Sequence, residues 1–219
     1  MSSSRSDHTA NRRPLTRERI LDVAIALIEH DGPEALSMRR LGAALGVEGM
    51  AIYHHFAGRE DLLGAIAERL LEPLDDLEQR SDWREDCHDF ATTLREVAVQ
   101  RPATFRLVGM QPLGEVLLLP VERLLGTLVE AGFEPVTALA IYRATISYAR
   151  GYALAEVTGF TVDAAGGSGL ERLQALRPDA FPVLAGRAGE LAELDPDRAF
   201  RLGLDALLRG LEGPEGAAR

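Results

Sequence analysis

The chain has 219 residues, a net charge of −10 and 46% apolar residues, which suits one compact domain or two small ones. No apolar run approaches the roughly 20 residues of a membrane helix, so we expect no membrane partner. The Ser-rich N-terminus lacks the apolar segment of a secretory signal, and a single cysteine excludes an internal disulfide. We therefore expect a cytoplasmic protein without a cofactor, and without a metal site because no Cys/His cluster has zinc spacing.

The negative charge is unevenly distributed along the chain. Residues 1–60 hold eight Arg and eight acidic residues, so the whole charge of −10 belongs to the remainder. A less acidic N-terminal part on an acidic protein orients that part toward nucleic-acid phosphates. Residues 1–13 are polar and basic without periodicity, which predicts a disordered tail that either follows DNA phosphates or stays solvated.

A first helix is predicted from about Thr16, a suitable N-cap, to Asp31, followed by the helix stop Gly32-Pro33. Its buried stripe would consist of Ile20, Val23, Ala24, Leu27 and Ile28.

Residues 37–59 have the pattern of two short helices joined by a tight turn. Ser37 is suited to cap the first helix, and Gly46 can end it in the left-handed conformation. Two apolar pairs with four-residue spacing mark the helix faces, namely Leu41 and Leu45, then Ile52 and Phe56. The spacing alone leaves open a plain helical hairpin or a helix-turn-helix that presents its second helix to the DNA major groove.

The residues themselves favour the second interpretation. The motif reads Leu41-Gly42-x-x-Leu45-Gly46-Val47, then Ile52-Tyr53-x-His55-Phe56, then Arg59-Glu60-Asp61-Leu62-Leu63. It closely resembles the DNA-binding domain of the tetracycline-repressor (TetR) family over residues 14–66. A weaker resemblance, to the ligand-binding domain of the tetracycline-repressor branch, reaches the C-terminus and includes Phe200-x-x-Gly203-Leu204-x-x-Leu207-Leu208-x-Gly210-Leu211-Glu212. The resemblance implies an all-α fold, with a three-helix DNA-binding domain at 14–62 and an effector-binding and dimerisation domain at 63–213.

The DNA contacts are expected around this motif. Arg39, at the start of the first motif helix, occupies a family position used for phosphate or guanine, and an arginine can grip guanine with two hydrogen bonds. The resemblance implies phosphate anchors at Tyr53, His54 and Arg59. His55 either does the same or packs against the first helix. Gly49, Met50 and Ala51, at the start of the recognition helix, have no side-chain donor, which predicts thymine-methyl contacts by Met50 and Ala51 in place of hydrogen-bond readout.

Beyond the motif, the pattern is helix after helix with no strand-like alternation. A fourth helix opens at Arg59 and is interrupted by Pro73, and Asp82 is suited to cap a fifth helix that runs to about Gln100. A short helix to Met110, helices at about 113–131 and 134–158, a flexible loop at 159–169 and a helix at 182–193 follow. The last helix is expected from Asp195-Pro196 to Gly213.

The last helix has one broad apolar face, formed by Phe200, Leu204, Leu207, Leu208 and Leu211, and Gly203 would allow close approach of another backbone. This face could pack inside its own subunit. The family resemblance implies instead a four-helix bundle between two subunits, shared with the small-residue helix at 134–158 that contains Gly151. A two-fold homodimer would place two recognition helices about 34–36 Å apart and require a near-palindromic operator in double-stranded DNA.

The helices between residues 83 and 158 are expected to enclose a small-molecule effector in a mostly apolar pocket. The expected lining residues are His88, Phe90, Leu94, Leu107, Met110, Gln111, Arg123, Tyr142 and Thr145. Tetracycline repressors bind a magnesium–drug complex through a histidine on the short helix, where this chain has Leu107. We therefore expect a hydrophobic effector rather than magnesium-tetracycline.

The expected function is a repressor that leaves its operator when an effector moves the 59–72 helix. Two alternatives stay open within the same fold, an activator and a DNA-binding regulator that answers to no ligand. A helical enzyme is a distant alternative, because Cys87 and His88 are adjacent and point about 100° apart on a helix. The sequence also lacks a Gly-rich phosphate loop and a nucleophile elbow.

Overall fold

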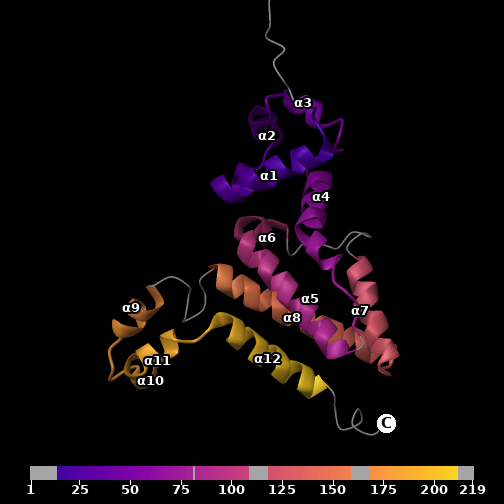
Figure 1. Ribbon diagram of the computed structural model, residues 1–219. Helices are drawn as coiled ribbons and strands as arrows, with labels where there is room; N and C mark the ends of the chain where they lie inside the picture. The colour runs from indigo at the N-terminus through magenta and orange to yellow at the C-terminus, as the bar shows by residue number, and fades with distance from the viewer. Residues whose placement is uncertain (1–13, 81, 109–117, 159–167, 212–219) are drawn as a thin grey trace, which may run out of the picture. The chain divides into compact units, whose positions relative to one another are not determined.

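A computed structural model describes residues 14–80, 82–108, 118–158 and 168–211. All regular elements in these ranges are helical, which confirms the predicted all-α class. The helices are α1 (Arg17–Asp31), α2 (Met38–Leu45), α3 (Gly49–Ile52), α4 (Arg59–Leu71), α5 (Trp83–Gln100), α6 (Pro102–Val108), α7 (Leu119–Glu130), α8 (Pro135–Thr158), α9 (Ser168–Gln174), α10 (Pro182–Gly186), α11 (Ala188–Ala192) and α12 (Pro196–Leu211), with 3₁₀ turns η1 (Pro33–Ala35) and η2 (Glu72–Leu74) (Figure 1). The chain divides into two compact units between Ile66 and Ala67, inside α4.

The first unit is organised on α1, which begins and ends where the sequence predicts. The Thr16 hydroxyl accepts a hydrogen bond from the Arg19 amide at 3.2 Å, and Gly32 ends the helix with a φ of 86°. Ile20, Ala24 and Ile28 are fully buried. This stripe supports α2 and the turns around it. The predicted tail at residues 1–13 lies outside the described residues.

The second unit is built on α5 and α8, which pack along each other, with α12 beside them (Figure 1). Asp82 caps α5 as predicted, because its carboxylate accepts a hydrogen bond from the Arg84 amide at 2.9 Å. α7 packs on both α5 and α8. Trp83 meets Phe133 edge-on, with ring centroids 5.0 Å apart, and so joins the start of α5 to the turn after α7.

Arg95 is itself buried and joins α5, α8 and α12 through ion pairs with Glu156 and Asp197. Its guanidinium donates two hydrogen bonds to Glu156, at 2.7 and 2.8 Å, and one to Asp197 at 2.7 Å. The same group lies over the rings of Tyr152 and Phe200. The hydrogen bonds to Glu156 raise the pKa of Arg95, and the hydrogen bond from Arg95 lowers the pKa of Asp197. This cluster fixes where α12 begins.

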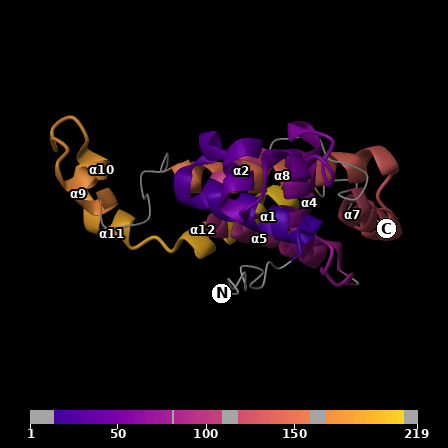
Figure 2. The same ribbon diagram turned by 90° about the horizontal axis from the view of Figure 1, so that it is seen from above.

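The segment between α8 and α12 differs from its prediction. The expected loop at 159–169 falls mainly outside the described residues, and Ser168 already belongs to α9. The single helix expected at 182–193 is two short helices broken at Arg187, in a stretch where Gly186 and Gly189 weaken helix formation. α9, α10 and α11 pack on one another and lie together in both views (Figure 2).

Candidate DNA interface and effector site

The motif at residues 37–59 has the local geometry that its sequence predicts. The Ser37 hydroxyl accepts a hydrogen bond from the Arg40 amide at 3.3 Å and caps α2. Gly46 ends α2 in the left-handed region, with a φ of 71°. Its amide and that of Val47 then bond back to the carbonyls of Ala43 and Gly42. The chain therefore turns sharply into α3, as a helix-turn-helix requires.

Gly42 sets the distance between the two motif helices, a role that the sequence analysis missed. A Cβ atom at Gly42 would lie 2.9 Å from the Gly49 amide nitrogen and 3.0 Å from the Val47 carbonyl oxygen. Both neighbours are backbone atoms, which cannot rotate away. α3 therefore keeps its place on α2 only because residue 42 has no side chain.

Gly42→Ala is expected to displace α3 and to cost about 1–3 kcal/mol of folding stability, the usual range for overpacking. Gly64→Ala is the matched control, because a Cβ at Gly64 meets nothing within 4 Å. Gly64 lies inside α4, so this change should stabilise the protein by about 0.5–1 kcal/mol. Urea unfolding of the two variants measures both effects. Equal stability of the two variants would contradict the close crossing.

α3 is shorter than predicted and ends before Phe56. Phe56 is nevertheless only 1% exposed, because the chain curls back after α3 and turns the ring inward. Arg17 of α1 holds this curl: its guanidinium lies 4.3 Å from the Phe56 ring centroid and donates to the His55 carbonyl oxygen at 3.0 Å. It also pairs with Asp61 at 3.8 Å. α1 thus braces the segment that follows the recognition helix.

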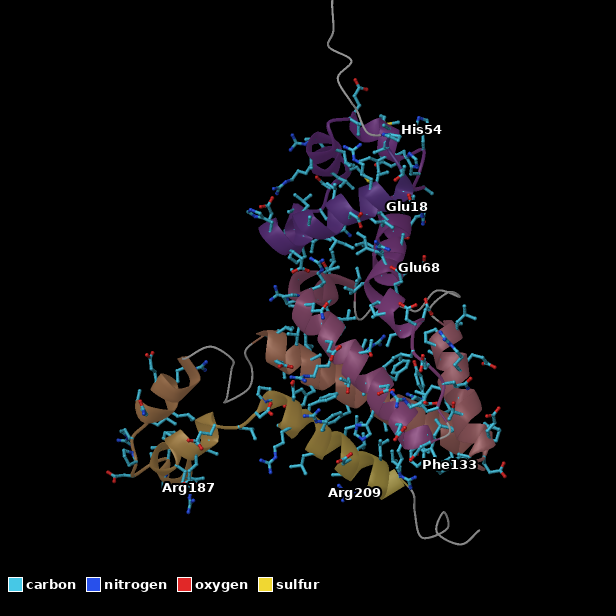
Figure 3. The ribbon with its side chains drawn as sticks, in the orientation of Figure 1. Glu18, His54, Glu68, Phe133, Arg187 and Arg209 are labelled. Atoms are coloured by element: carbon cyan, nitrogen blue, oxygen red, sulfur yellow. The ribbon has the colours of Figure 1, made fainter. Side chains whose placement is uncertain are left out.

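The predicted DNA-contact residues lie on α2, on α3 and the turn that follows it, and at the start of α4. Met50 is 69% exposed and Tyr53 is 45% exposed. Exposed side chains also extend from Arg39, His54 and Arg59, whereas Gly49, Ala51 and His55 are half-buried. His54 is labelled beside α3 in Figure 3.

The cationic members of this set differ from their neighbours in their pairing. Within the part of the chain that the structure describes, Arg39 and Arg59 form no ion pair or side-chain hydrogen bond. Arg40, by contrast, is committed to Asp31 at 2.6 Å. Arg39 and Arg59 are therefore available to phosphate or a base edge at no cost of a broken ion pair.

Among the described residues of the second unit, two neighbouring hollows share Leu74 and Phe90. One encloses about 330 Å³ between atoms, partly open to solvent, and is lined by Leu74, Leu77, Glu78, Gln79, Asp86, Asp89, Phe90, Pro120, Arg123 and Leu124. The other comprises about 260 Å³ of space between atoms, also partly open to solvent, and is lined by Leu71, Leu74, Phe90, Leu94, Val121, Tyr142, Ile146 and Arg150. We call the second one the Arg150 hollow. Both volumes include space open to solvent, so the enclosed part is small for a drug-sized ligand, and a ligand would have to push helices or side chains apart.

Four of the predicted pocket residues line these hollows, namely Phe90, Leu94, Arg123 and Tyr142. His88 does not line them. It stands two residues before Phe90 on α5 and so faces the opposite side of the helix, where its Nε2 lies 2.7 Å from a carboxylate oxygen of Asp205 on α12. Thr145 is fully buried beside Cys87, and Leu107 of α6 is not among the lining residues. Met110 and Gln111 lie outside the described residues.

Arg150 is a lining residue that the sequence analysis missed. The available signal was spacing, since Tyr142, Ile146 and Arg150 follow one another at four-residue intervals and so share one face of α8. The other missed lining residues, including Leu71, Leu74 and Val121, come from three different elements. Only the fold brings these elements together.

A polar network closes one side of the larger hollow. Arg123 donates to the Asp75 carbonyl oxygen at 2.9 Å, and the Gln79 amide donates to the Thr127 hydroxyl at 3.1 Å. That hydroxyl donates in turn to the buried carboxylate of Asp86 at 2.8 Å. The network ties the segment after α4 to α5 and α7.

The predicted dimer residues lie mainly inside the subunit. Phe200, Leu204 and Leu208 are at most 1% exposed. The space beside Gly203 is filled by Tyr148 of the same chain, whose hydroxyl donates to the Phe200 carbonyl oxygen at 2.9 Å. This face of α12 therefore packs on its own α8, the alternative that the sequence left open. Among the remaining predicted residues, Leu207 and Leu211 are half-buried and Gly151 is exposed.

Cys87 has no features of a nucleophile. It is fully buried, and burial raises the pKa of its thiol to about 12, so the thiol stays protonated at neutral pH. Within the described ranges, no three His, Cys, Asp or Glu side chains come close enough together to hold a metal ion. None of the described helices combines the length and the apolar character needed to span a membrane.

Comparison with known proteins agrees with this architecture. The family described as "Bacterial regulatory proteins, tetR family" matches residues 20–66, which contain the helix-turn-helix. The family described as "Tetracyclin repressor-like, C-terminal domain" matches residues 75–214. Both matches support a transcriptional regulator and not an enzyme.

Individual relatives cover most of the chain. The class C tetracycline repressor of Escherichia coli is 30% identical over 221 residues, 90% of this chain and 91% of the repressor. A possible TetR family regulator from Streptomyces coelicolor superposes with a TM-score of 0.75 at 29% identity, over 90% of this chain and 98% of that one. The S. coelicolor protein ActR in complex with actinorhodin gives a TM-score of 0.72 at 26% identity, over 94% of this chain and all of that one (100%). The chain belongs to the TetR family of bacterial transcriptional regulators.

Proposed function

We propose that the protein is a ligand-responsive repressor that binds a near-palindromic operator as a homodimer and is released by a small, mostly apolar effector. The observation that carries the proposal is the pairing of an exposed, cationic helix-turn-helix with a largely apolar hollow at the end of α4. ActR, solved with actinorhodin bound, and the tetracycline repressors support a small-molecule effector. Leu107 stands where the family resemblance implies a magnesium-binding histidine, which favours an effector that needs no magnesium.

The reading of DNA would use two kinds of contact. Arg39 would bind guanine or phosphate, and Tyr53, His54 and Arg59 would hold phosphates and set the register. Met50, the most exposed residue of α3, would contact a thymine methyl group. Ala51 would make the same kind of contact, and His55 would either hold a phosphate or pack against α1.

The dimer would form on the side of α8 that its own subunit leaves uncovered. An exposed stripe with helical spacing follows α8, formed by Val136, Ala140, Arg143, Ser147, Gly151 and Leu154. Val136 is 81% exposed, and α8 carries only three charged residues in 24. Leu202 of α12 adds a further apolar side chain that is 66% exposed. Apart from Arg143, this surface consists of apolar and small residues, which favours close packing of a second copy.

Gly151→Glu is expected to convert the dimer to monomers, because it would place two carboxylates on the two-fold interface. A Cβ at Gly151 meets nothing within 4 Å in its own subunit, so the change is compatible with the fold. Gly189→Glu, at an equally open glycine of α11, is the matched control and should remain dimeric. Sedimentation velocity at micromolar concentration separates the two states. A dimeric Gly151→Glu variant would exclude this face.

Selection of bound sequences from random duplex DNA tests the regulator itself. We expect the protein to enrich a near-palindromic sequence whose half-sites lie about one helical turn apart. The selection should be run at low salt, where phosphate contacts are strongest. Absence of any enrichment, with protein shown to be folded by circular dichroism, would overturn the proposed function.

A further inference from the structure

Arg150 places an unpaired positive charge in the wall of an apolar hollow. Its Nε is buried and has no hydrogen-bond partner, and within the described ranges no carboxylate pairs with its guanidinium. The other lining residues are apolar except Tyr142, which lies two turns earlier on the same face of α8. Burial lowers the pKa of Arg150, whereas the nearby Tyr142 acts in the opposite direction.

Arg150 is half-buried, and its buried Nε lacks the hydrogen bond that would offset its loss of water. A buried charge normally has a partner, because transfer of a charge from water is strongly unfavourable. Arg95, a buried arginine of this unit, follows that rule with Glu156 and Asp197. Arg123, in the wall of the larger hollow, is likewise paired with Asp75. Arg150 differs from Arg95 and Arg123 because no carboxylate of the described residues pairs with it. The anionic partner of its guanidinium would therefore come from outside the described chain.

We propose that the effector carries an anionic oxygen, which binds the Arg150 guanidinium while the apolar body of the effector fills the space between Leu74, Phe90 and Leu94. The inference rests on the proposed effector site and narrows its ligand class to hydrophobic acids. The Tyr142 hydroxyl is the second polar group available in this wall and can donate to the same oxygen. The rings of Phe90 and Tyr142 pack edge-on, with their centroids 6.1 Å apart, and offer a surface for the flat apolar part of an effector.

The hollow also lies where a bound acid can be sensed. Leu71 and Leu74 belong to its wall and form the C-terminal end of α4 and the turn η2. Because the hollow is small, insertion of a ligand would displace these side chains. The charge that binds the acid is thus in the same wall as the end of the helix that continues from the DNA-binding unit.

The test compares acids with uncharged amides of the same shape. Naphthoate and naphthamide form one pair, and diphenylacetate and diphenylacetamide form another. Calorimetric titration of the full-length protein should show about 10- to 100-fold tighter binding of each acid than of its amide. In Arg150→Gln the ratio should fall to about one, whereas Arg106→Gln, at an exposed arginine of α6, should keep the wild-type ratio.

Three results would overturn the inference. The wild type could bind acid and amide equally, the acid preference could persist in Arg150→Gln, or the protein could bind neither member of either pair. Thermal unfolding without ligand adds an independent measurement. Arg150→Gln should unfold at the same temperature as the wild type or higher, since it removes an unpaired charge. A lower unfolding temperature would show that Arg150 is paired and so contradict its proposed role. The random-duplex selection does not depend on these ligands. It therefore distinguishes failure of the proposed regulator function from failure of the proposed acid binding.

Discussion

Arg39→Ala is expected to weaken operator binding by about 5- to 150-fold for each half-site of the operator, which corresponds to the 1–3 kcal/mol of one bidentate arginine–guanine contact. Arg39 is exposed at the start of α2 and forms no ion pair within the described residues, so its loss should leave the fold intact. If it reads guanine, the variant should also accept other bases at one position of each half-site. Fluorescence anisotropy on the selected operator and on single-base variants measures both effects.

Arg40→Ala is the matched control for this prediction. Arg40 is the next residue of α2 and is also exposed, but its guanidinium is engaged by Asp31 at 2.6 Å. The control should retain operator affinity within about threefold and lose at most about 1 kcal/mol of stability, as for other surface ion pairs. Equal losses of affinity in the two variants would indicate a general effect of positive charge rather than a specific contact by Arg39.

Arg95→Met is expected to give the largest loss of stability, about 3 kcal/mol, at the lower end of the range for breaking a buried ion pair. The side chains of Arg95 and Glu156 are 8% and 17% exposed, so the change leaves a largely buried carboxylate without its partner. Asp197 is 67% exposed and contributes less, since water screens its pairing. Urea unfolding monitored by circular dichroism measures the loss.

The same cluster predicts how stability depends on pH. The hydrogen bond from Arg95 holds the pKa of Asp197 below its ordinary value of 3.8. A lowered carboxyl pKa contributes stability above the pKa of the unfolded chain, and this contribution is lost as the pH falls through the folded-state value. The wild type should therefore lose stability more steeply below about pH 4 than Arg95→Met does.

Two further variants separate the ion pair from other effects of the substitution. Arg187→Met breaks the ion pair of Arg187 with Glu190, whose two side chains are 64% and 69% exposed. This change should lower the folding stability by less than about 1 kcal/mol. Adding Glu156→Gln to Arg95→Met removes the orphaned charge and should restore part of the lost stability. If the double variant is no more stable than Arg95→Met, the cost comes from lost packing of the arginine and not from the unpaired carboxylate.

The features that the sequence predicts well are local ones. The capping roles of Ser37 and Asp82, the left-handed turn at Gly46 and the break at Pro73 each depend on a few neighbouring residues. The apolar stripe of α1 depends only on helical periodicity. Such signals act over one or two turns of a helix, so they can be read without knowledge of the tertiary fold.

The features that the sequence does not predict arise from packing between distant segments. The apolar face of α12 indicates burial but not the partner, and in the structure the partner is α8 of the same chain. His88 was assigned to the pocket by composition, whereas the position of Asp205 on α12 decides where it points. The role of Gly42 depends on the path of the Gly49 backbone. Each case requires coordinates from a second element.

The proposed route from effector to DNA follows the chain itself. α4 contains the boundary between the two units, and its last turn and η2 line the Arg150 hollow. The polar network of Asp75, Gln79, Asp86, Arg123 and Thr127 holds the next segment to the second unit. A ligand that widens the Arg150 hollow would therefore move the end of α4 relative to the following segment, which the polar network holds in place. It can favour release only to the extent that it binds the released conformation better.

The most direct test of this account is the affinity for the selected operator, measured by fluorescence anisotropy with and without a compound that raises the unfolding temperature. A stabilising compound identifies itself by mass action, because it binds the folded protein. We predict that operator affinity falls by about 5- to 150-fold at saturating compound, the usual range of allosteric coupling. By linkage, the operator should weaken binding of the compound by the same factor. Unchanged or tighter operator binding would contradict release by the effector.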